Sequence, residues 1–532
     1  MDQLTETDVL VIGAGPTGLT TANLLADLGV RVVLVDKLPG SGDEPRAISV
    51  TDETLRIMQQ IGIMDRLGPE MLMGTGSRYY GRNGQLLAEA RPAGRRLGQP
   101  GKSQFDQPVM ESLLLEAARE RNIDVRFGSE AFSVQDRGTH ADVTLIDDTG
   151  KKTVRATWVV ACDGGRSPVR TQLGIPMEGS TQVQKWIVID ILNTGEHEKF
   201  ADFYCNGSRP CVVVPGVKGR RRFEFMLLPG ETPAEMTTPE AVASLVKPFQ
   251  EVRPEDIRRA AVYVAHQRVA LTFRQGRVLL AGDAAHMMPP FAGQGLNAGI
   301  RDAANLAWKV AAAVKGTGTD ALISTYDSER RPHARDMVRI SHRIGKVVMS
   351  TNPKLTPLRD AAITASGIIP SVKAWLVGMR FLKQPHFTQG CVVTPGPEVP
   401  KAAAALVGRS LSQPTVELVD GERVPLDEVL GYGWSILRAG PAGKIQVQRI
   451  GVDAPAGKPG ETILVTDLDD AFLPLGQHNV SLIVRPDRYV AAACLTGTES
   501  SALASLGRLV PVLGTPASPP AVPAGQQAPS LR

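Results

Sequence analysis

A glycine-rich segment near the start of the chain has the residue types of a phosphate-binding turn. Residues 13–18 read Gly-Ala-Gly-Pro-Thr-Gly and follow a short apolar run. Gly13 permits a tight turn, Gly15 lets the backbone approach a pyrophosphate, and Gly18 lets the following helix pack on the strand. The first N–H groups of that helix favour phosphates. Asp36, which ends the next apolar run, is placed to bind a ribose hydroxyl, so the segment predicts a dinucleotide site without separating FAD from NAD.

A second motif combines a carboxylate at a strand end with another glycine-rich turn. Residues 277–281 predict a short buried strand, which ends at Gly282 and Asp283. A carboxylate in that place can hold the hydroxyls of a ribityl chain. Residues 293–297, Gly-Gln-Gly-Leu-Asn, open a helix whose N–H groups can point at the N1–C2=O edge of a flavin. Because that edge becomes negative on reduction, the helix dipole would stabilise it, and the motif favours FAD.

A third pair of residues, Asp163 and Gly164, follows the apolar residues 158–160. Taken alone, the pair is most simply a turn that ends a buried strand. Its position between the two glycine-rich motifs is what gives it a functional interpretation.

Short buried strands and long helices must hold these motifs in place. Apolar runs at residues 9–12 and 31–35 predict strands on either side of the first helix. From about residue 77 to 104 the chain is rich in Gly and Arg and predicts loops or edge strands. Successive strands over 180–270 predict a β-rich domain inserted into the first, and a long helix is expected from about Leu296.

The bulk composition is that of an ordinary globular protein. The chain has 532 residues, with 59 Lys and Arg against 55 Asp and Glu and a net charge of +4. Its one dense basic run, residues 220–222, is interpreted as a solvated turn, so we expect no nucleic-acid partner. The five cysteines form no C-x-x-C pair, the N-terminus is acidic, and no apolar stretch is long enough to span a bilayer. We therefore expect a soluble, cytoplasmic protein with no signal peptide and no membrane partner.

The three motifs in this order resemble those of the p-hydroxybenzoate hydroxylase superfamily of FAD-dependent aromatic monooxygenases. The resemblance covers about residues 5–390. More narrowly, the chain is similar to the 3-(3-hydroxyphenyl)propionate hydroxylases of the phenol-hydroxylase-like branch. That similarity lies in residues 45–47, 186–191, 221–226, 229–232, 477–479 and 485–488.

The resemblance implies a mixed α/β (α+β) fold. Its parts are a Rossmann-like FAD-binding domain, an inserted β-sheet substrate domain and a thioredoxin-like C-terminal domain. The expected boundaries are 1–180 and 270–395 for the discontinuous FAD-binding domain with a helical extension, 181–269 for the substrate domain, 396–508 for the C-terminal domain and 509–532 for a disordered tail. Because the C-terminal unit has no C-x-x-C pair, we expect it to serve packing or oligomerisation, with a homodimer as one form, and not thiol chemistry.

Individual residues acquire roles by the same resemblance. Asp36 stands in the place of the acidic residue on the adenosine ribose, where Glu is commoner. Arg46 and Gln107 are implied to contact the phosphate–ribityl region of FAD, and Asp283 its pyrophosphate–ribityl part. Asp163 is implied to lie near FAD and the nicotinamide path. The residues implied to line the isoalloxazine are Pro290, Gly293, Gln294, Gly295, Leu296 and Asn297.

The implied reaction uses NADH or NADPH to reduce FAD, after which O2 gives a flavin C4a-hydroperoxide that hydroxylates a phenolic ring. The protein supplies orientation, electrostatics and a dry cavity. A base or hydrogen-bond acceptor is expected to assist the phenol, and the sequence does not identify it. His286 is one candidate, although a structural hydrogen bond explains it more simply. Tyr204 and Arg209 are hypotheses for residues that face the substrate, with Arg209 gripping a substrate carboxylate.

Two other functions fit the same motifs. An FAD-dependent oxygenase of a polyketide or another larger aromatic would share them, and Phe291 and Ala292 depart from the propionate hydroxylases. A dehydrogenase, or a flavin-binding protein without turnover, is the other class, and the Gly282-Asp283 motif argues against a dehydrogenase. The five tryptophans form no W-x-W-x-I-P element of a flavin halogenase, the eight histidines show no metal-ligand spacing, and no Gly-x-Ser-x-Gly elbow is present.

Overall fold

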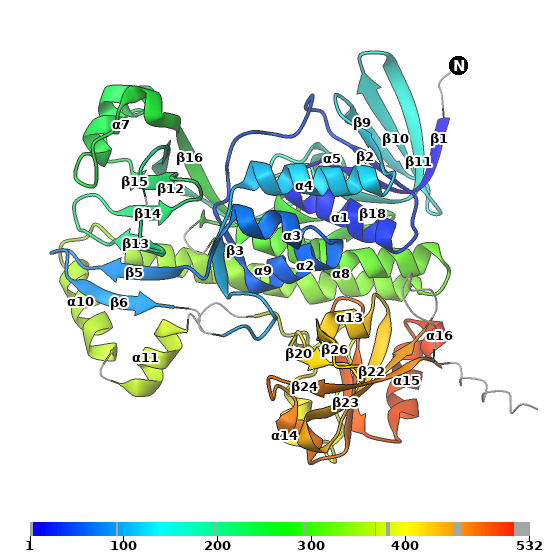
Figure 1. Ribbon diagram of the computed structural model, residues 1–532. Coiled ribbons are helices and arrows are strands. Elements are labelled where there is room, and N and C mark those ends of the chain that lie inside the picture. The colour runs from blue at the N-terminus through cyan, green and yellow to red at the C-terminus, as the bar shows by residue number, and fades with distance from the viewer. Residues whose placement is uncertain are drawn as a thin grey trace, which may run out of the picture.

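A computed structural model of the protein shows three large sheets and one small sheet around a set of long helices (Figure 1). The structure describes residues 4–91, 94–195, 197–290, 293–367, 369–378, 384–451 and 460–514. Phe291 and Ala292, and residues 515–532 of the expected tail, lie outside the described residues. The mixed α/β fold class and the presence of a C-terminal domain are confirmed.

The first sheet has a parallel core made of short apolar runs. Its parallel strands lie in the order β18 (Val278–Leu280), β11 (Gly150–Ala161), β1 (Leu4–Ile12), β2 (Val32–Val35) and β8 (Asp124–Arg126). Antiparallel strands extend it, namely β9 (Glu130–Asp136), β10 (Ala141–Asp147) and β17 (Arg274–Gln275). The strands of the parallel core are apolar over their central residues because these are buried on both faces.

Four long helices pack beside this sheet. They are α1 (Pro16–Asp27), α4 (Gln107–Glu120), α8 (Gly295–Val314) and α9 (Asp320–Val348). Helix α1 packs against both α4 and α8, and α8 packs against α9. The short helix α5 (Pro168–Gln172) follows β11. The glycine-rich turn therefore lies where β1 enters a helix with neighbours on two sides.

The second sheet forms the other large layer, at the left of Figure 1. Its strands lie in the order β19 (His286–Met287), β16 (Ile257–Ala270), β12 (Met177–Ile191), β15 (Arg221–Met226), β14 (Cys211–Pro215), β13 (Phe200–Tyr204), β5 (Gly76–Tyr80) and β6 (Leu86–Ala90). Helices α6 (Pro233–Met236) and α7 (Pro239–Val246) follow β15. Val242 and Val246 of α7 pack on one face of the sheet, among Phe223 and Phe225.

Residues 77 to 104, expected to form loops or edge strands, contribute β5 and β6 to the second sheet, where β6 is the edge strand and β5 lies inside the sheet. Strand β5 pairs in parallel with β13, so the second sheet draws on a segment well before its expected start at 181. Strand β12 also begins earlier, at Met177. The pairing joins segments more than 120 residues apart in sequence, and no local pattern encodes such a contact.

A small sheet connects the first two. It consists of β3 (Ser49–Thr51), β7 (Lys102–Gln104) and β4 (Leu72–Met73), in the order β3-β7-β4. Helices α2 (Asp52–Ile61) and α3 (Met64–Leu67) follow β3. In the register of the sheet, Thr51 lies opposite Lys102. This places residues of the small sheet beside both the glycine-rich motifs and the second sheet.

The C-terminal domain is built on a seven-stranded sheet. Its strands are β21 (Arg423–Pro425), β20 (Thr415–Glu417), β24 (Thr462–Asp467), β23 (Lys444–Ile450), β22 (Trp434–Ala439), β25 (Val480–Val484) and β26 (Val490–Leu495). Its helices are α12 (Lys401–Ala404), α13 (Leu426–Leu430), α14 (Leu473–Gly476), α15 (Glu499–Gly507) and α16 (Pro511–Gly514). Trp308 of α8 packs edge-on against Trp434, which joins this domain to the long helices.

A disordered tail is expected from residue 509, but the first residues of that segment, up to Gly514, are ordered and partly helical. Helix α16 occupies Pro511–Gly514, and Val510 and Leu513 are buried in the apolar cluster around Trp434. Proline-rich composition predicted disorder, but burial of two apolar side chains on a ready-made surface offsets the ordering cost. The helical extension holds α10 (Leu355–Ser366) and α11 (Pro370–Val377), next to β6.

The basic run 220–222 is not a solvated turn, contrary to the interpretation of the sequence. Arg220 and Arg222 are 2% and 1% exposed. Arg220 pairs with Asp106 at 2.9 Å, and Arg222 pairs with Asp190 at 2.9 Å. Both acids come from distant segments, so the run could not reveal them.

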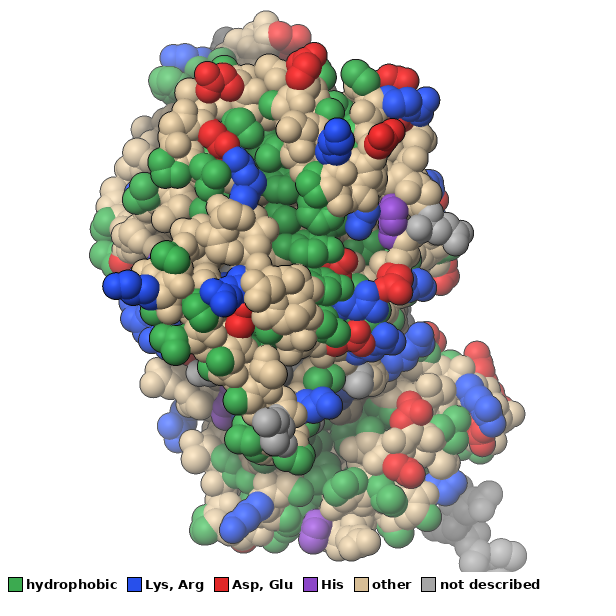
Figure 2. All heavy atoms as spheres, turned by 90° about the vertical axis from the view of Figure 1, so that its left-hand side faces the viewer, with side chains coloured by type: hydrophobic (Ala, Val, Ile, Leu, Met, Phe, Trp, Pro, Cys, Tyr) green, Lys and Arg blue, Asp and Glu red, His purple; other side chains and the backbone are tan. Residues whose placement is uncertain are grey.

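The molecular surface carries charges of both signs. Figure 2 shows Lys and Arg side chains interspersed with Asp and Glu on the face that carries the second sheet, with hydrophobic side chains between them. This view agrees with the small net charge of +4. No helix in the described part of the chain combines the length and the apolar character needed to cross a bilayer.

Candidate active site

A cavity of about 670 Å³ lies where the first sheet, the small sheet and the second sheet meet. Gly15, Arg46, Gln107, Asp283 and residues 293–297 line one part of it. Side chains of β5, β7, β13, β14 and β15 line the other part. Most residues that the sequence singled out for a cofactor are thus brought to one continuous space, although they come from four separate segments.

The three glycines of the first turn play distinct geometric roles. Gly13 has a φ of +106°, and a Cβ there would lie 2.4 Å from the carbonyl oxygen of Cys162. A Cβ on Gly18 would lie 1.8 Å from the carbonyl oxygen of Gly13. Gly15 differs, because no protein atom lies within 4 Å of its Cβ position. Gly13 and Gly18 are required by the fold itself, whereas Gly15 leaves open space in front of the start of α1.

The side chain of Asp36 holds the first glycine-rich turn in place through hydrogen bonds to the backbone. Its carboxylate accepts hydrogen bonds from the backbone N–H of Ala14 at 2.7 Å and of Leu38 at 2.8 Å. It is not among the residues that line the cavity. A carboxylate has about four lone-pair sites, so acceptor capacity remains for a hydroxyl. The ribose role of Asp36 stays a prediction.

Arg46 and Gln107 lie together at the entrance to the same space. The side-chain oxygen of Gln107 accepts from the backbone N–H of Ala47 at 2.6 Å, and its amide donates to Glu111 at 2.7 Å. Gln107 therefore holds the loop that carries Arg46. The Arg46 side chain is exposed at the cavity, and within the described residues its guanidinium has no recorded hydrogen-bond partner. It is available to an anionic ligand.

The two aspartates of the strand-end motifs differ in their surroundings. Asp283 lines the cavity with its side chain exposed to the open space, and desolvation by the surrounding protein raises the pKa of its carboxyl group. One oxygen of Asp163 accepts from the backbone N–H of Val169 at 3.1 Å. The other oxygen is buried without a partner among the described residues, and burial raises the pKa of this group too. Gly164 lines the cavity beside it, with no protein atom within 4 Å of its Cβ position.

The second glycine-rich turn is held by the side chain of Asn297. Its oxygen accepts from Thr54 Oγ1 at 2.7 Å and from the Thr51 backbone N–H at 3.0 Å. Its amide donates to the carbonyl of Gly293 at 2.7 Å. Helix α8 begins at Gly295, whose Cβ position is also free of protein atoms within 4 Å. The start of a 20-residue helix thus faces the cavity with its positive dipole end.

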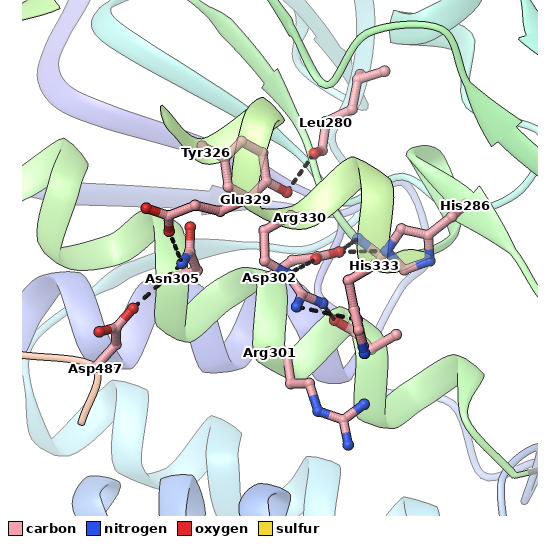
Figure 3. Close-up of polar contacts among 12 residues, drawn as sticks. Leu280, His286, Arg301, Asp302, Asn305, Tyr326, Glu329, Arg330, His333 and Asp487 are labelled. Atoms are coloured by element: carbon pink, nitrogen blue, oxygen red, sulfur yellow. Dashed lines mark hydrogen bonds and ion pairs between the residues drawn. The ribbon is translucent and has the colours of Figure 1, made fainter. Parts of the chain in front are cut away.

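His286 lies outside the lining residues and is fully buried. Its Nε2 lies 2.6 Å from Asp302 Oδ2, and Arg330 donates to the other oxygen of Asp302 at 2.8 Å (Figure 3). The Gly282 backbone N–H also donates to Asp302, at 3.1 Å. This network holds the Gly282-Asp283 strand end against α8. The geometry supports the structural interpretation of His286 over a role as base.

Tyr204 and Arg209 are not brought to the cavity. Alternation along β13 turns Phe203 and Ala201 toward the cavity, whereas Tyr204 stacks with Tyr80 and packs in the cluster under α7. Arg209 is ion-paired with Glu231. The register of β13 turns Tyr204 away from the cavity, and Arg209, in the loop between β13 and β14, is held by Glu231. The geometry therefore does not support the hypothesis that these two residues face the substrate, which stays a prediction.

The Arg209→Ala variant is accordingly expected to leave the KM for acidic phenols unchanged. Its guanidinium is already committed to Glu231 and to the carbonyl of Met226, at 3.2 Å. Steady-state kinetics with a phenolic acid would check this. A selective rise in KM for acids over neutral phenols would return Arg209 to the site.

Sequence reasoning missed the polar residues on the wall formed by the second sheet and the small sheet. They are Ser77, Tyr79, Lys102, Arg222 and Glu224. No local signal marked Ser77, Tyr79 or Lys102, and the stretch 221–226, although noted for its resemblance, gave no sign that Arg222 and Glu224 line a cavity. Burial raises the pKa of Glu224, which accepts from the hydroxyl of Tyr263 at 3.3 Å. Arg222, beside it, is neutralised by Asp190.

These features fit a bound flavin dinucleotide. The free space at Gly15 and the free start of α8 face the cavity, where the ligand would supply atoms, and an unpartnered oxygen of Asp163 is buried next to the lining residues Cys162 and Gly164. The cavity volume lies within the range of ordinary small-molecule sites. Arg46 lines the same cavity, and a guanidinium is suited to pair with a diphosphate.

Comparison with known proteins places these observations in context. The family model described as an FAD binding domain matches residues 6–341, and that described as the HcaD C-terminal domain matches residues 408–509. The 3-(3-hydroxy-phenyl)propionate/3-hydroxycinnamic acid hydroxylase of Mycolicibacterium smegmatis is 37% identical, over 91% of this chain and 90% of that protein. A hydroxylase of the same description from Burkholderia vietnamiensis is 35% identical, over 92% of this chain and 94% of its own length.

Among solved structures, the flavin-dependent monooxygenase PieE, determined in complex with FAD and substrate, has a similar fold. Its TM-score is 0.79 at 22% identity, covering 96% of this chain and 99% of that one. At this identity the likeness concerns the fold alone.

Proposed function

The chain belongs to the FAD-binding-domain family of aromatic-ring monooxygenases that contains the 3-(3-hydroxyphenyl)propionate hydroxylases, and we propose that it hydroxylates a phenolic acid of that kind. It is an FAD-dependent oxidoreductase with NAD(P)H and O2 as co-substrates. Family membership argues against a dehydrogenase and against a flavin-binding protein without turnover.

One observation carries the proposal for the substrate. The cavity that holds the dinucleotide motifs continues to a wall of the second sheet that presents both apolar and polar side chains. The apolar side chains of this wall are Ala201, Phe203, Val212 and Val214, and Met288, together with Ile344 of α9, adds apolar lining from outside the sheet. Such a wall accepts an aromatic ring and excludes water from it. Lys102 and Glu224 add polar groups to this wall. A small phenolic acid needs such groups to be held in one orientation.

The residues of this chain divide the work between cofactor and substrate. When bound, FAD supplies the hydride-accepting and oxygen-activating chemistry that side chains lack. Gly15, Arg46 and the start of α8 are proposed to hold and orient it. Glu224 offers a carboxyl oxygen on the substrate wall, which can accept a hydrogen bond from a phenol hydroxyl.

The test is turnover by purified protein that contains FAD. NADH and NADPH oxidation would be followed with 3-(3-hydroxyphenyl)propionate, related phenolic acids and larger polyketide phenols, while hydroxylated product and hydrogen peroxide are measured together. We expect a phenolic acid to stimulate oxidation and to yield a dihydroxylated product with little peroxide. Turnover of polyketide phenols alone would replace the substrate class, and an absence of FAD or of oxygen uptake would contradict the proposal.

Cellular location and assembly remain predictions. The five cysteines are free, and burial raises the pKa of the Cys391 and Cys494 thiols to about 12 and about 11. Thiols of this kind are poor nucleophiles, so the C-terminal domain is proposed to act through packing. We propose a cytoplasmic location because the cysteines form no disulfide framework. A homodimer is proposed as one way in which the C-terminal domain could act through packing.

A further inference from the structure

The positively charged side chains that line the cavity differ in whether a protein carboxylate already neutralises them. Five such side chains line it, namely Arg46, Arg96, Lys102, Arg222 and Arg301. Arg222 is paired with Asp190, and Arg301 with Glu53. Arg96 donates to the carbonyl of Ser410 at 2.8 Å. Arg46 lies at the phosphate end, so Lys102 is the cation left for the substrate end.

Lys102 carries unused hydrogen-bonding capacity. Its ammonium donates to Ser77 Oγ at 2.9 Å, and within the described residues no carboxylate pairs with it. An ammonium has three donors, so two remain. Ser77 accepts from Lys102 and keeps its own hydroxyl proton to donate. The two side chains together form a site with several donors and one positive charge.

The surroundings make an unpaired charge costly at this point. Lys102 reaches from β7 toward β5, beside Tyr79 and the apolar wall of Phe203 and Ala201. Burial lowers the pKa of Lys102 to about 8. Lys102 is half-buried at the cavity, so its ammonium is less well solvated than an exposed one, and an anionic ligand would stabilise its charge.

We propose that Lys102 and Ser77 bind the carboxylate of the phenolic-acid substrate and thereby select acids over neutral phenols. The inference rests on the proposed function and names the residues that would give its specificity. A carboxylate enters the cavity ionised and needs a cation there, whereas a phenol enters neutral and needs an acceptor, which Glu224 provides. Lys102 thus takes the role that the sequence suggested for Arg209.

The test compares two ligands that differ at one group. Binding of 3-(3-hydroxyphenyl)propionate and of 3-(3-hydroxyphenyl)propan-1-ol to the FAD-loaded protein would be measured by calorimetry, alongside KM and kcat. For Lys102→Gln we expect the Kd of the acid to rise by about 30-fold or more, since one partner of a buried charge pair is lost. The Kd of the alcohol should change by less than about 3-fold. Lys102→Arg should recover part of the affinity, and the exposed Lys247→Gln serves as the matched control.

A pH series gives an independent readout. Lys102 is charged below its pKa of about 8, so affinity for the acid should be full near pH 7 and fall as the pH rises through 8 to 9. The other ionisable groups that line the cavity among the described residues come from all of its walls, namely Arg46, Asp52, Tyr79, Arg96, Cys162, Arg222, Glu224, Asp283 and Arg301. Lys102→Arg keeps these groups and removes the titration at position 102, so its affinity should stay level over the same range.

The outcomes separate this inference from the proposed function. If the wild-type protein hydroxylates the acid but Lys102→Gln binds it equally well, the carboxylate site is wrong and the function stands. Equal losses for acid and alcohol would assign Lys102 to the phenol oxygen and overturn the proposal. A wild-type protein that binds neither ligand would overturn both.

Discussion

Replacing Gly15 by alanine is expected to give a folded protein that has lost most of its affinity for FAD. The φ of Gly15 is −76°, a value that alanine adopts without strain, and no protein atom lies within 4 Å of the added Cβ. The methyl group would instead occupy the space in front of the start of α1, where the turn would hold a diphosphate. A methyl group inserted into a close contact costs about 1–3 kcal/mol, which weakens binding by about 5- to 150-fold.

The measurement is the dissociation constant for FAD, from fluorescence titration of the apoprotein, together with the unfolding midpoint without FAD. Gly42→Ala is the matched control, since its Cβ position is also free of contacts and it lies outside the cavity lining. Gly18→Ala should behave differently and fail to fold, because its Cβ would collide with the Gly13 carbonyl. If Gly15→Ala binds FAD as tightly as the wild type, the phosphate site lies elsewhere.

Replacing Glu329 by glutamine is expected to destabilise the protein by about 3–5 kcal/mol, because it leaves buried cations without their counter-charge. Glu329 on α9 pairs with Lys309 of α8 at 2.8 Å and with Arg485 of the C-terminal domain at 2.9 Å. It also accepts from Asn305 at 2.7 Å, and Asn305 in turn reaches Asp487 (Figure 3). All of these side chains are buried, so solvent cannot compensate for the lost charge.

The Glu329 carboxyl should also make the stability of the protein depend on pH. Burial alone would raise the pKa of Glu329, but Arg485 and Lys309 outweigh it and lower the pKa to about 2 from an ordinary value of 4.5. A carboxyl whose folded pKa is depressed contributes stability above its unfolded pKa. That contribution should be complete above about pH 5 and be lost as the pH falls from 4.5 toward 2.

Urea unfolding of wild type and Glu329→Gln between pH 7 and pH 3 would measure both effects. The difference between the two proteins should shrink as the pH falls. Asp8→Asn serves as the control, because its pair with Arg31 is solvent-exposed and should contribute no more than about 1 kcal/mol. A Glu329→Gln variant as stable as this control would mean that the cluster does not hold the C-terminal domain in place.

The network around Glu329 belongs to a wider contact between the C-terminal domain and the cofactor region. The hydroxyl of Tyr489 donates to Glu53 at 2.5 Å, and Glu53 pairs with Arg301, which donates to Gln294 at 3.2 Å. Gln294 lies at the start of α8, on the cavity. The domain therefore supports the second glycine-rich turn through buried polar contacts.

Much of the cofactor site could be predicted because its signals are local. Gly18 is required by a contact within one strand–turn–helix unit, the positive φ of Gly13 belongs to the same turn, and the free space at Gly15 lies in that unit too. The strands around them are continuous apolar runs, which predict burial on both faces without knowledge of their neighbours. Family resemblance then supplied the flavin and the class of reaction, and the comparisons bear it out.

The substrate wall depended on contacts that no local pattern contains. Tyr204 and Phe203 are adjacent in sequence, yet the register of β13 turns one away from the cavity and the other into it. Arg220 and Arg222 appear as a solvated run until Asp106 and Asp190 are placed beside them.

The sequence by itself determined the dinucleotide turn, the class of cofactor and the order of the main elements, since each is encoded within a few tens of residues. The tertiary structure alone decided which side chains meet the substrate and how the C-terminal domain is held. Lys102 meets Ser77 through the packing of two sheets, and Glu329 meets Arg485 across 156 positions of sequence. Such contacts depend on strand register and on the burial of charges with distant partners, and these are properties of the packed molecule.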